Sequence, residues 1–154
     1  MTTLAAWPEQ NVLHVHKEID IAAPLTVVFE SLLEQLGPEH DLPTSGLPLP
    51  LKLEAWPGGR WYRDLGSNGG HLWGHVQVIK PPTLLEITGP LFMSYPVISH
   101  LQYRLSEHGS GTRITLRHRA IGELEREHRE GAGPGWAYRL ERVRKHAEGR
   151  ATGR

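Results

Sequence analysis

The chain has 154 residues, of which 38% are hydrophobic and 22% are charged, and its 17 basic side chains balance its 17 acidic ones. This length and composition predict a single packed domain over residues 1–154 and exclude a disordered chain. The charge balance gives no reason to expect a nucleic acid as partner, and the absence of cysteine excludes disulfides, thiolate metal sites and a cysteine nucleophile.

Neither a targeting signal nor a membrane span is predicted. Met1–Gln10 has no basic n-region and no apolar h-region, so we expect no signal peptide. No apolar run approaches the roughly 18 residues that a membrane span needs. We therefore expect a cytoplasmic protein that does not insert into membranes.

The first predicted elements are a strand and a helix. Residues 11–21 alternate apolar and polar side chains, which is typical of a half-buried strand. Pro24 suits the first position of a helix, and apolar residues then recur at four-residue spacing up to Leu36. Gly37-Pro38 ends this helix. Residues 38–50 hold four prolines and predict an irregular loop.

The middle of the chain predicts a series of antiparallel strands. Glycine and proline separate the apolar segments, and Asn68-Gly69 is a strong hairpin signal because both residues accept the positive φ of tight turns. The predicted strands cover residues 51–56, 60–65, 71–79, 84–88, 97–106 and 112–121.

The chain is predicted to close with a helix. Residues 123–130 are polar and indicate a solvated connector or a short surface helix, and Gly131-Ala132-Gly133 indicates a break. A helix is then predicted from about Pro134, with Trp136 and Leu140 on its apolar face. The order strand, helix, six strands and helix predicts an α+β fold with an antiparallel sheet and helices on one side.

Several ordered motifs resemble one known superfamily. They are Glu18 to Pro24, Val28-Phe29, Pro57 to Trp61, Gly74 to Val76, Pro81-Pro82 followed by Leu85, and Gly135-Trp136 followed by Leu140, Val143 and His146. Residues 12–148 resemble the SRPBCC (START-like, helix-grip) superfamily. Within it, they are most similar to the group named after the C-terminal domain of the heat-shock chaperone ATPase activator.

The resemblance implies a helix-grip fold, in which a curved antiparallel sheet of about seven strands wraps around a long C-terminal helix. It also implies a cavity between sheet and helix, and a short helical segment near the N-terminus. Members bind lipids, sterols, polyketides and other hydrophobic molecules, and a minority catalyse cyclisation, dehydration or hydrolysis. The expected partner is thus a small hydrophobic molecule, the expected state is a monomer or homodimer, and no cofactor is expected.

Strand parity predicts which side chains face the helix. In the strand 97–106 the inward residues have odd numbers, and in the strand 112–121 they have even numbers. The turn between these strands pairs odd-numbered with even-numbered positions, so both sets of residues face the same side of the sheet. The predicted wall comprises Val97, Ser99, Leu101, Tyr103, Leu105, Ile114, Leu116, His118 and Ala120, together with Leu72, Gly74, Val76, Val78, Leu85, Ile87, Trp61, Arg63 and Leu65.

Polar side chains on this apolar wall are candidate ligand anchors. Arg63 and His118 each need a partner, because an unpaired polar group is costly to bury. Arg63 either pairs locally with Glu54 or Glu86 or binds a carboxylate on the ligand. His118 either bonds locally or orients the ligand, and burial should lower its pKa. Tyr103 is either a core aromatic or a third anchor.

Large apolar side chains complete the predicted ligand site. Trp136 either packs the helix on the sheet or stacks on the ligand, and the loop 89–96 is either a gate over the pocket or a dimer contact. The predicted ligand-binding residues are Arg63, Trp61, Trp73, Leu85, Phe92, Met93, Leu101, Tyr103, His118, Trp136 and Leu140.

Three functions follow as hypotheses. The first is a module that binds a small hydrophobic molecule, with a carboxylate if Arg63 anchors it. The second is an enzyme of the cyclase, dehydratase or hydrolase type, with His118 as general acid or base and Tyr103 or Arg63 polarising a carbonyl. The third is a co-chaperone or protein-interaction module. No metal site is expected, since the ten histidines show no ligand spacing.

Overall fold

The computed structural model describes residues 11–153, so Met1–Gln10, from which we predicted no signal peptide, lies outside the described residues. Its elements are β1 (Val12–Ile21), α1 (Leu25–Leu36), β2 (Lys52–Leu53), β3 (Arg60–Gly66), β4 (Gly69–Lys80), β5 (Leu84–Gly89), β6 (Val97–His108), β7 (Gly111–Gly122) and α2 (Arg126–Ala151). The strands form one antiparallel sheet in the order β1-β7-β6-β5-β4-β3-β2.

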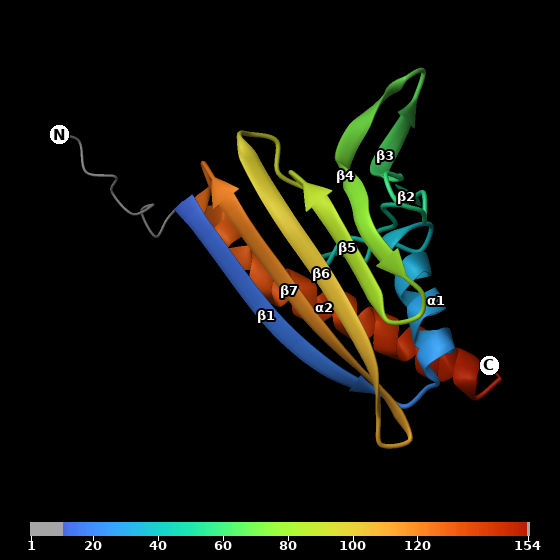
Figure 1. Ribbon diagram of the computed structural model, residues 1–154. Coiled ribbons are helices and arrows are strands. Elements are labelled where there is room, and N and C mark those ends of the chain that lie inside the picture. The colour runs from blue at the N-terminus through green and yellow to red at the C-terminus, as the bar shows by residue number, and fades with distance from the viewer. Residues whose placement is uncertain (1–10, 154) are drawn as a thin grey trace.

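The sheet curves over α2, which crosses one of its faces, and α1 lies against the C-terminal half of α2 (Figure 1). This arrangement confirms the predicted α+β fold and its helix-grip form. Within residues 11–153, no helix is both long and apolar enough to cross a membrane.

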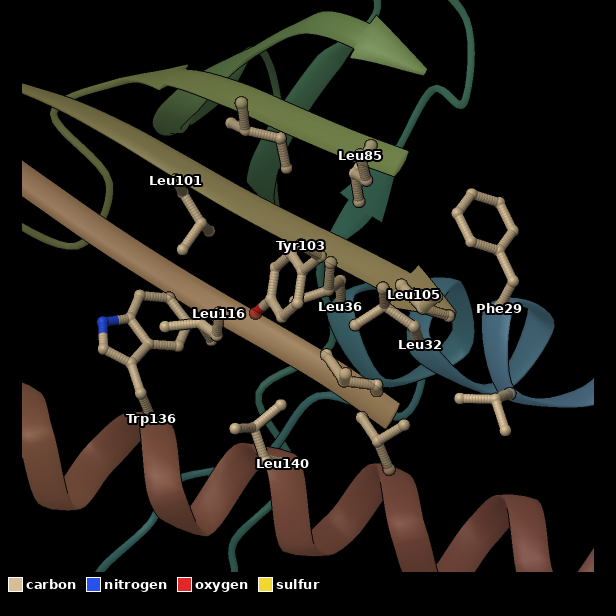
Figure 2. Close-up of a cluster of buried hydrophobic side chains, with 14 of the residues drawn as sticks. Phe29, Leu32, Leu36, Leu85, Leu101, Tyr103, Leu105, Leu116, Trp136 and Leu140 are labelled. Carbon is tan, nitrogen blue, oxygen red and sulfur yellow. The ribbon is translucent and has the colours of Figure 1, made fainter. Parts of the chain in front are cut away.

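The core lies between the sheet and the two helices. The two inward rows predicted for β6 and β7 are confirmed, and Leu101, Tyr103 and Leu116 are completely buried. Figure 2 shows these side chains meeting Leu36 from α1 and Leu140 from α2. Alternation with a period of two thus places one face of each strand against the helices.

The helix α2 begins eight residues earlier than predicted. It starts at Arg126 and runs through Gly131 and Pro134 without the predicted break. The physical reason is tertiary packing, because Ala132 and Trp136 are both buried against the sheet. Burial of these side chains outweighs the low helix propensity of the intervening glycines and proline. Residues 126–130 are consequently the first turn of this helix rather than a connector.

A bulge in β4 corrects the predicted inward row of that strand. Trp61 pairs with Gly74 and Tyr62 pairs with Leu72, so Trp73 is an extra residue between two pairs. Trp73 and Gly74 are therefore both buried, whereas Leu72 is 44% exposed and does not belong to the wall.

The predicted place of Arg63 and Leu65 in the wall that the helix covers is wrong. Both side chains are exposed, Leu65 at 63%, because the end of the β3–β4 hairpin projects beyond the helices (Figure 1). Strand parity predicts which face a side chain is on but not whether another element covers that face. Nor does Arg63 pair with Glu54, which binds the side chain of Arg60 instead through two contacts of 2.8 Å.

Candidate functional site

A pocket of about 450 Å³ opens between the first half of α2, the loop 38–50, the first half of β4 and the loop 89–96. Its lining is mostly apolar, with a few polar side chains at fixed places. The residues that line it are His40, Leu42, Pro43, Leu49, Trp73, Phe92, Glu127, His128, Gly131, Ala132, Gly135, Trp136 and Arg139.

Three aromatic side chains from three different elements line the pocket. Phe92 lies at the centre, with its ring centroid 6.0 Å from that of Trp73 and 6.5 Å from that of Trp136. The bulge in β4 turns Trp73 inward, where its ring packs edge-on against Trp61 at 5.0 Å. These aromatic faces offer a planar ligand a stacking surface.

Small residues on α2 make room for the pocket. Gly131, Ala132 and Gly135 lie on the side of the helix that faces the cavity. A Cβ atom added at Gly131 or Gly135 would meet no described atom within 4 Å, so the space beside both glycines is open. Gly131 and Ala132, two of the three residues that suggested a break in the helix, thus belong to the pocket wall.

The loop 38–50 forms the opposite wall and is held in two ways. His40 and Leu49 exchange two hydrogen bonds, one between backbone groups and one from the imidazole Nδ1 to the Leu49 carbonyl at 3.1 Å. The guanidinium of Arg139 donates hydrogen bonds to the carboxylate of Asp41, at 2.8 Å, and to its backbone carbonyl. Tyr138 also donates to the Asp41 carboxylate, at 3.1 Å. This ion pair ties the loop to α2.

The mouth of the pocket carries a hydrogen-bonded tyrosine–histidine pair. The Tyr95 hydroxyl accepts the backbone N–H of Glu125 at 3.2 Å and lies 2.8 Å from Nδ1 of His128. The two rings are stacked, with an interplanar angle of 20°. Phe92 packs edge-on against the His128 ring at 5.3 Å. The orientation of this imidazole is thus fixed from both sides.

His118 faces inward as predicted, but it lies behind the aromatic side chains and does not line the pocket. The indole N–H of Trp136 donates to its Nδ1 at 2.9 Å, and its Nε2 lies 2.9 Å from the hydroxyl of Ser99. Because an indole nitrogen only donates, Nδ1 carries no proton and Nε2 does. The imidazole is neutral, and burial lowers its pKa to about 4.

The stability of the protein should consequently depend on His118 at acid pH. Its pKa is about 4 in the folded chain and about 6.5 in the unfolded chain, so its contribution is complete above pH 6.5 and is lost as pH falls toward 4. We expect His118→Gln to flatten the decline of unfolding free energy between pH 6.5 and 4. Urea denaturation at several pH values measures it.

The exposed His14 on β1 supplies the matched control for this substitution. His14→Gln should leave the pH profile of the wild type unchanged. A profile of His118→Gln that runs parallel to the wild type would contradict the neutral, buried imidazole. Part of the acid sensitivity should persist in His118→Gln, because burial and the nearby Arg139 also lower the pKa of His40 to about 4.

Of the residues predicted from the sequence, the pocket brings together Trp73, Phe92 and Trp136. The others are buried elsewhere, except for the exposed Arg63. Trp61 donates its indole N–H to the carbonyl of Leu36 at 2.7 Å and joins β3 to α1. The residues that pack the core without lining this pocket are Leu85, Leu101, Tyr103 and Leu140.

Two of these buried candidates have features of their own. Met93 is completely buried in a separate small cluster with Ala120 and Leu124 and does not line the pocket. Tyr103 is completely buried, and its hydroxyl has no hydrogen-bond partner among the residues that the structure describes. Burial raises the pKa of this hydroxyl.

The prediction missed the polar residues of the pocket, His40, Glu127, His128 and Arg139. Arg139 follows Trp136 by three residues and precedes Val143 by four, so helical spacing already places it on the buried face. His40 lies in an irregular loop, and His128 lies in a polar stretch predicted as a solvated connector or a short surface helix, where no apolar periodicity could place it.

Metal-binding residue types are not assembled at this site. Over residues 11–153, no group of three or more His, Asp or Glu side chains is placed to hold a metal ion.

Comparison with known proteins identifies a family model and a set of similar folds. The family described as activator of Hsp90 ATPase homolog 1-like protein matches residues 22–148. No curated protein matches the chain. Protein MLL2253 from Mesorhizobium loti is 18% identical, with 86% of this chain and 95% of that chain covered and a TM-score of 0.65.

Two further solved structures are similar to this chain. CalU16 from Micromonospora echinospora is 21% identical over 92% of this chain and 79% of that chain, with a TM-score of 0.58. The di-domain ARO/CYC StfQ of the steffimycin biosynthetic pathway is 13% identical over 93% of this chain and 53% of that chain, with a TM-score of 0.65. At these identities the likeness is one of fold.

Proposed function

Since the chain belongs to the family of activator of Hsp90 ATPase homolog 1-like proteins, we propose that it is a binding protein for a small hydrophobic molecule. The ligand occupies the pocket between α2 and the loop 38–50, against the rings of Trp73, Phe92 and Trp136. The observation that carries this proposal is the combination of a cavity of about 450 Å³ with three aromatic side chains in its lining. Ligand sites typically have this size and this apolar character.

The proposed ligand is uncharged. Arg63, the predicted partner of a carboxylate, is exposed on the projecting hairpin. The pocket's own arginine, Arg139, already binds the carboxylate of Asp41. Glu127 at the rim would repel an anion. A carboxylate in the pocket would therefore lose its hydration without gaining a free cation.

Substitution of Phe92 tests the pocket directly. We expect Phe92→Ala to weaken binding of the neutral fluorescent probe N-phenyl-1-naphthylamine by about tenfold, because the central ring of the stacking surface is lost. Fluorescence titration of the purified protein measures the dissociation constant. Native mass spectrometry of the same preparation identifies any molecule that co-purifies.

The control is Ile98→Ala, which changes a 73% exposed residue on the opposite face of the sheet, beside a second hollow of about 900 Å³. This variant should bind the probe as the wild type does. Equal affinities for the wild type and Phe92→Ala, or a loss confined to Ile98→Ala, would refute a site beside α2.

The geometry gives less support to the second hypothesis, an enzyme in which His118 and Tyr103 take part in catalysis. Both ring nitrogens of His118 are engaged, by Trp136 and Ser99, and neither the imidazole nor Tyr103 lines the pocket. A general acid or base must come within hydrogen-bond reach of the atom that it protonates or deprotonates. Both side chains are buried in the core, out of contact with the space that a ligand would occupy.

A further inference from the structure

The binding pocket holds two imidazoles whose hydrogen-bonding roles are opposite. His40 lies on the loop wall and His128 at the mouth, and the rings of Trp73 and Phe92 connect them, since His40 packs edge-on against Trp73 at 5.5 Å. A neutral imidazole has one donor and one acceptor nitrogen, and the partner of one nitrogen determines what the other can do.

His40 presents an acceptor to the pocket. Its Nδ1 lies 3.1 Å from the carbonyl oxygen of Leu49, and because a carbonyl only accepts, Nδ1 carries the proton. His40 is 8% exposed, and burial together with the nearby Arg139 disfavours a second proton on its ring. Its Nε2 therefore has a free lone pair, and no group among residues 11–153 donates a hydrogen bond to it.

His128 presents a donor to the pocket. The Tyr95 hydroxyl accepts the backbone N–H of Glu125, and among residues 11–153 the one acceptor recorded within reach of its own proton is Nδ1 of His128, so the hydroxyl donates there. The proton of the neutral ring is then on Nε2. If the ring gains a second proton, Nε2 still donates. The His128 side chain thus offers a hydrogen-bond donor to the pocket in either state.

From this complementary pair we infer that the ligand carries a hydroxyl group, which donates to Nε2 of His40, and a carbonyl oxygen, which accepts from Nε2 of His128. The inference rests on the proposed function, because it assigns the polar groups of the molecule that stacks on Trp73, Phe92 and Trp136. A ligand in the pocket displaces water from this acceptor, which is costly unless the ligand supplies a donor, and a ligand hydroxyl supplies one. His40 is in this sense a specificity-determining residue.

Three related naphthalenes separate the two contacts. The first, 6-hydroxy-2-acetylnaphthalene, bears both groups; in 6-methoxy-2-acetylnaphthalene the hydroxyl donor is blocked; and 2-naphthol lacks the carbonyl. Isothermal titration calorimetry should give the first compound the lowest dissociation constant. We expect the methoxy compound to bind about tenfold more weakly, because it leaves the His40 acceptor without a partner. We expect 2-naphthol to bind several-fold more weakly.

The substitution His40→Asn tests the acceptor nitrogen Nε2 of His40 separately from the other contacts. The asparagine amide can still donate to the Leu49 carbonyl, as Nδ1 of the histidine does, but the acceptor in the Nε2 position is removed. In this variant the hydroxy and methoxy compounds should bind with nearly equal affinity. The matched control is His71→Asn, which alters a histidine beside Trp73 that does not line the pocket and should retain the tenfold preference.

The outcomes distinguish this inference from the function on which it rests. If the wild type binds the hydroxy and methoxy compounds equally, the hydroxyl contact is overturned and the binding function stands. If His40→Asn retains the preference, the assignment of the acceptor to His40 is overturned. If no naphthalene binds and no molecule co-purifies with the protein, the proposed function and the inference fall together.

Discussion

Asp41→Ala should lower the free energy of unfolding by about 3–5 kcal/mol, more than any exposed charge substitution in this chain. The guanidinium of Arg139 is 3% exposed and donates to both the carboxylate and the backbone carbonyl of Asp41. Removing the carboxylate leaves a buried cation without its counter-charge, which is the costly way to disrupt an ion pair. Chemical denaturation at pH 7 measures the loss.

The double variant Asp41→Ala/Arg139→Met distinguishes the charge effect from simple loss of packing. Because it removes both charges, it should be more stable than Asp41→Ala alone. Asp20→Ala is the control, since it breaks the exposed pair of Asp20 with Arg113 and should have little effect. A double variant no more stable than Asp41→Ala would mean that the buried charge is not the source of the loss.

Leu140→Ala should destabilise the chain by about 2–5 kcal/mol, the range for truncating a buried leucine. Leu140 is 2% exposed and points from α2 into the core, as Figure 2 shows beside Trp136. The truncation loses apolar contacts and leaves a cavity that the surrounding strands fill only partly. Thermal and urea denaturation both measure the effect.

The same truncation at Leu65, which is 63% exposed on the projecting hairpin, is the matched control for Leu140→Ala. It should change the free energy of unfolding by less than about 0.5 kcal/mol. A loss of similar size at both positions would show that α2 does not pack on the sheet through Leu140.

The sequence was sufficient to predict the sheet because its strands contain strong alternation and clear turns. Ser99, Leu101 and His118 face inward as their parity requires. Alternation fixes a face for every residue of a regular strand. It failed at Trp73, because a bulge adds one residue and reverses the parity beyond it.

The site was predictable only where it shares residues with the core. Trp73, Phe92 and Trp136 were found because large apolar residues stand out in any sequence. His40 and His128 were not, since their places depend on an irregular loop and on a helix start that tertiary packing decides. A polar pocket residue acquires its role from partners far away in the chain, such as Arg139 for Asp41.

The two open glycines of α2 have a consequence for how this fold could diverge. Gly131 and Gly135 both line the pocket, and a Cβ atom added at either position would meet no described atom within 4 Å. Replacing a glycine inside a helix by alanine also favours the helix, by about 1 kcal/mol. If the proposed function holds, a single substitution at either position should reduce the space open to the ligand while stabilising the helix. Selectivity for molecular size can thus evolve on α2 independently of the core.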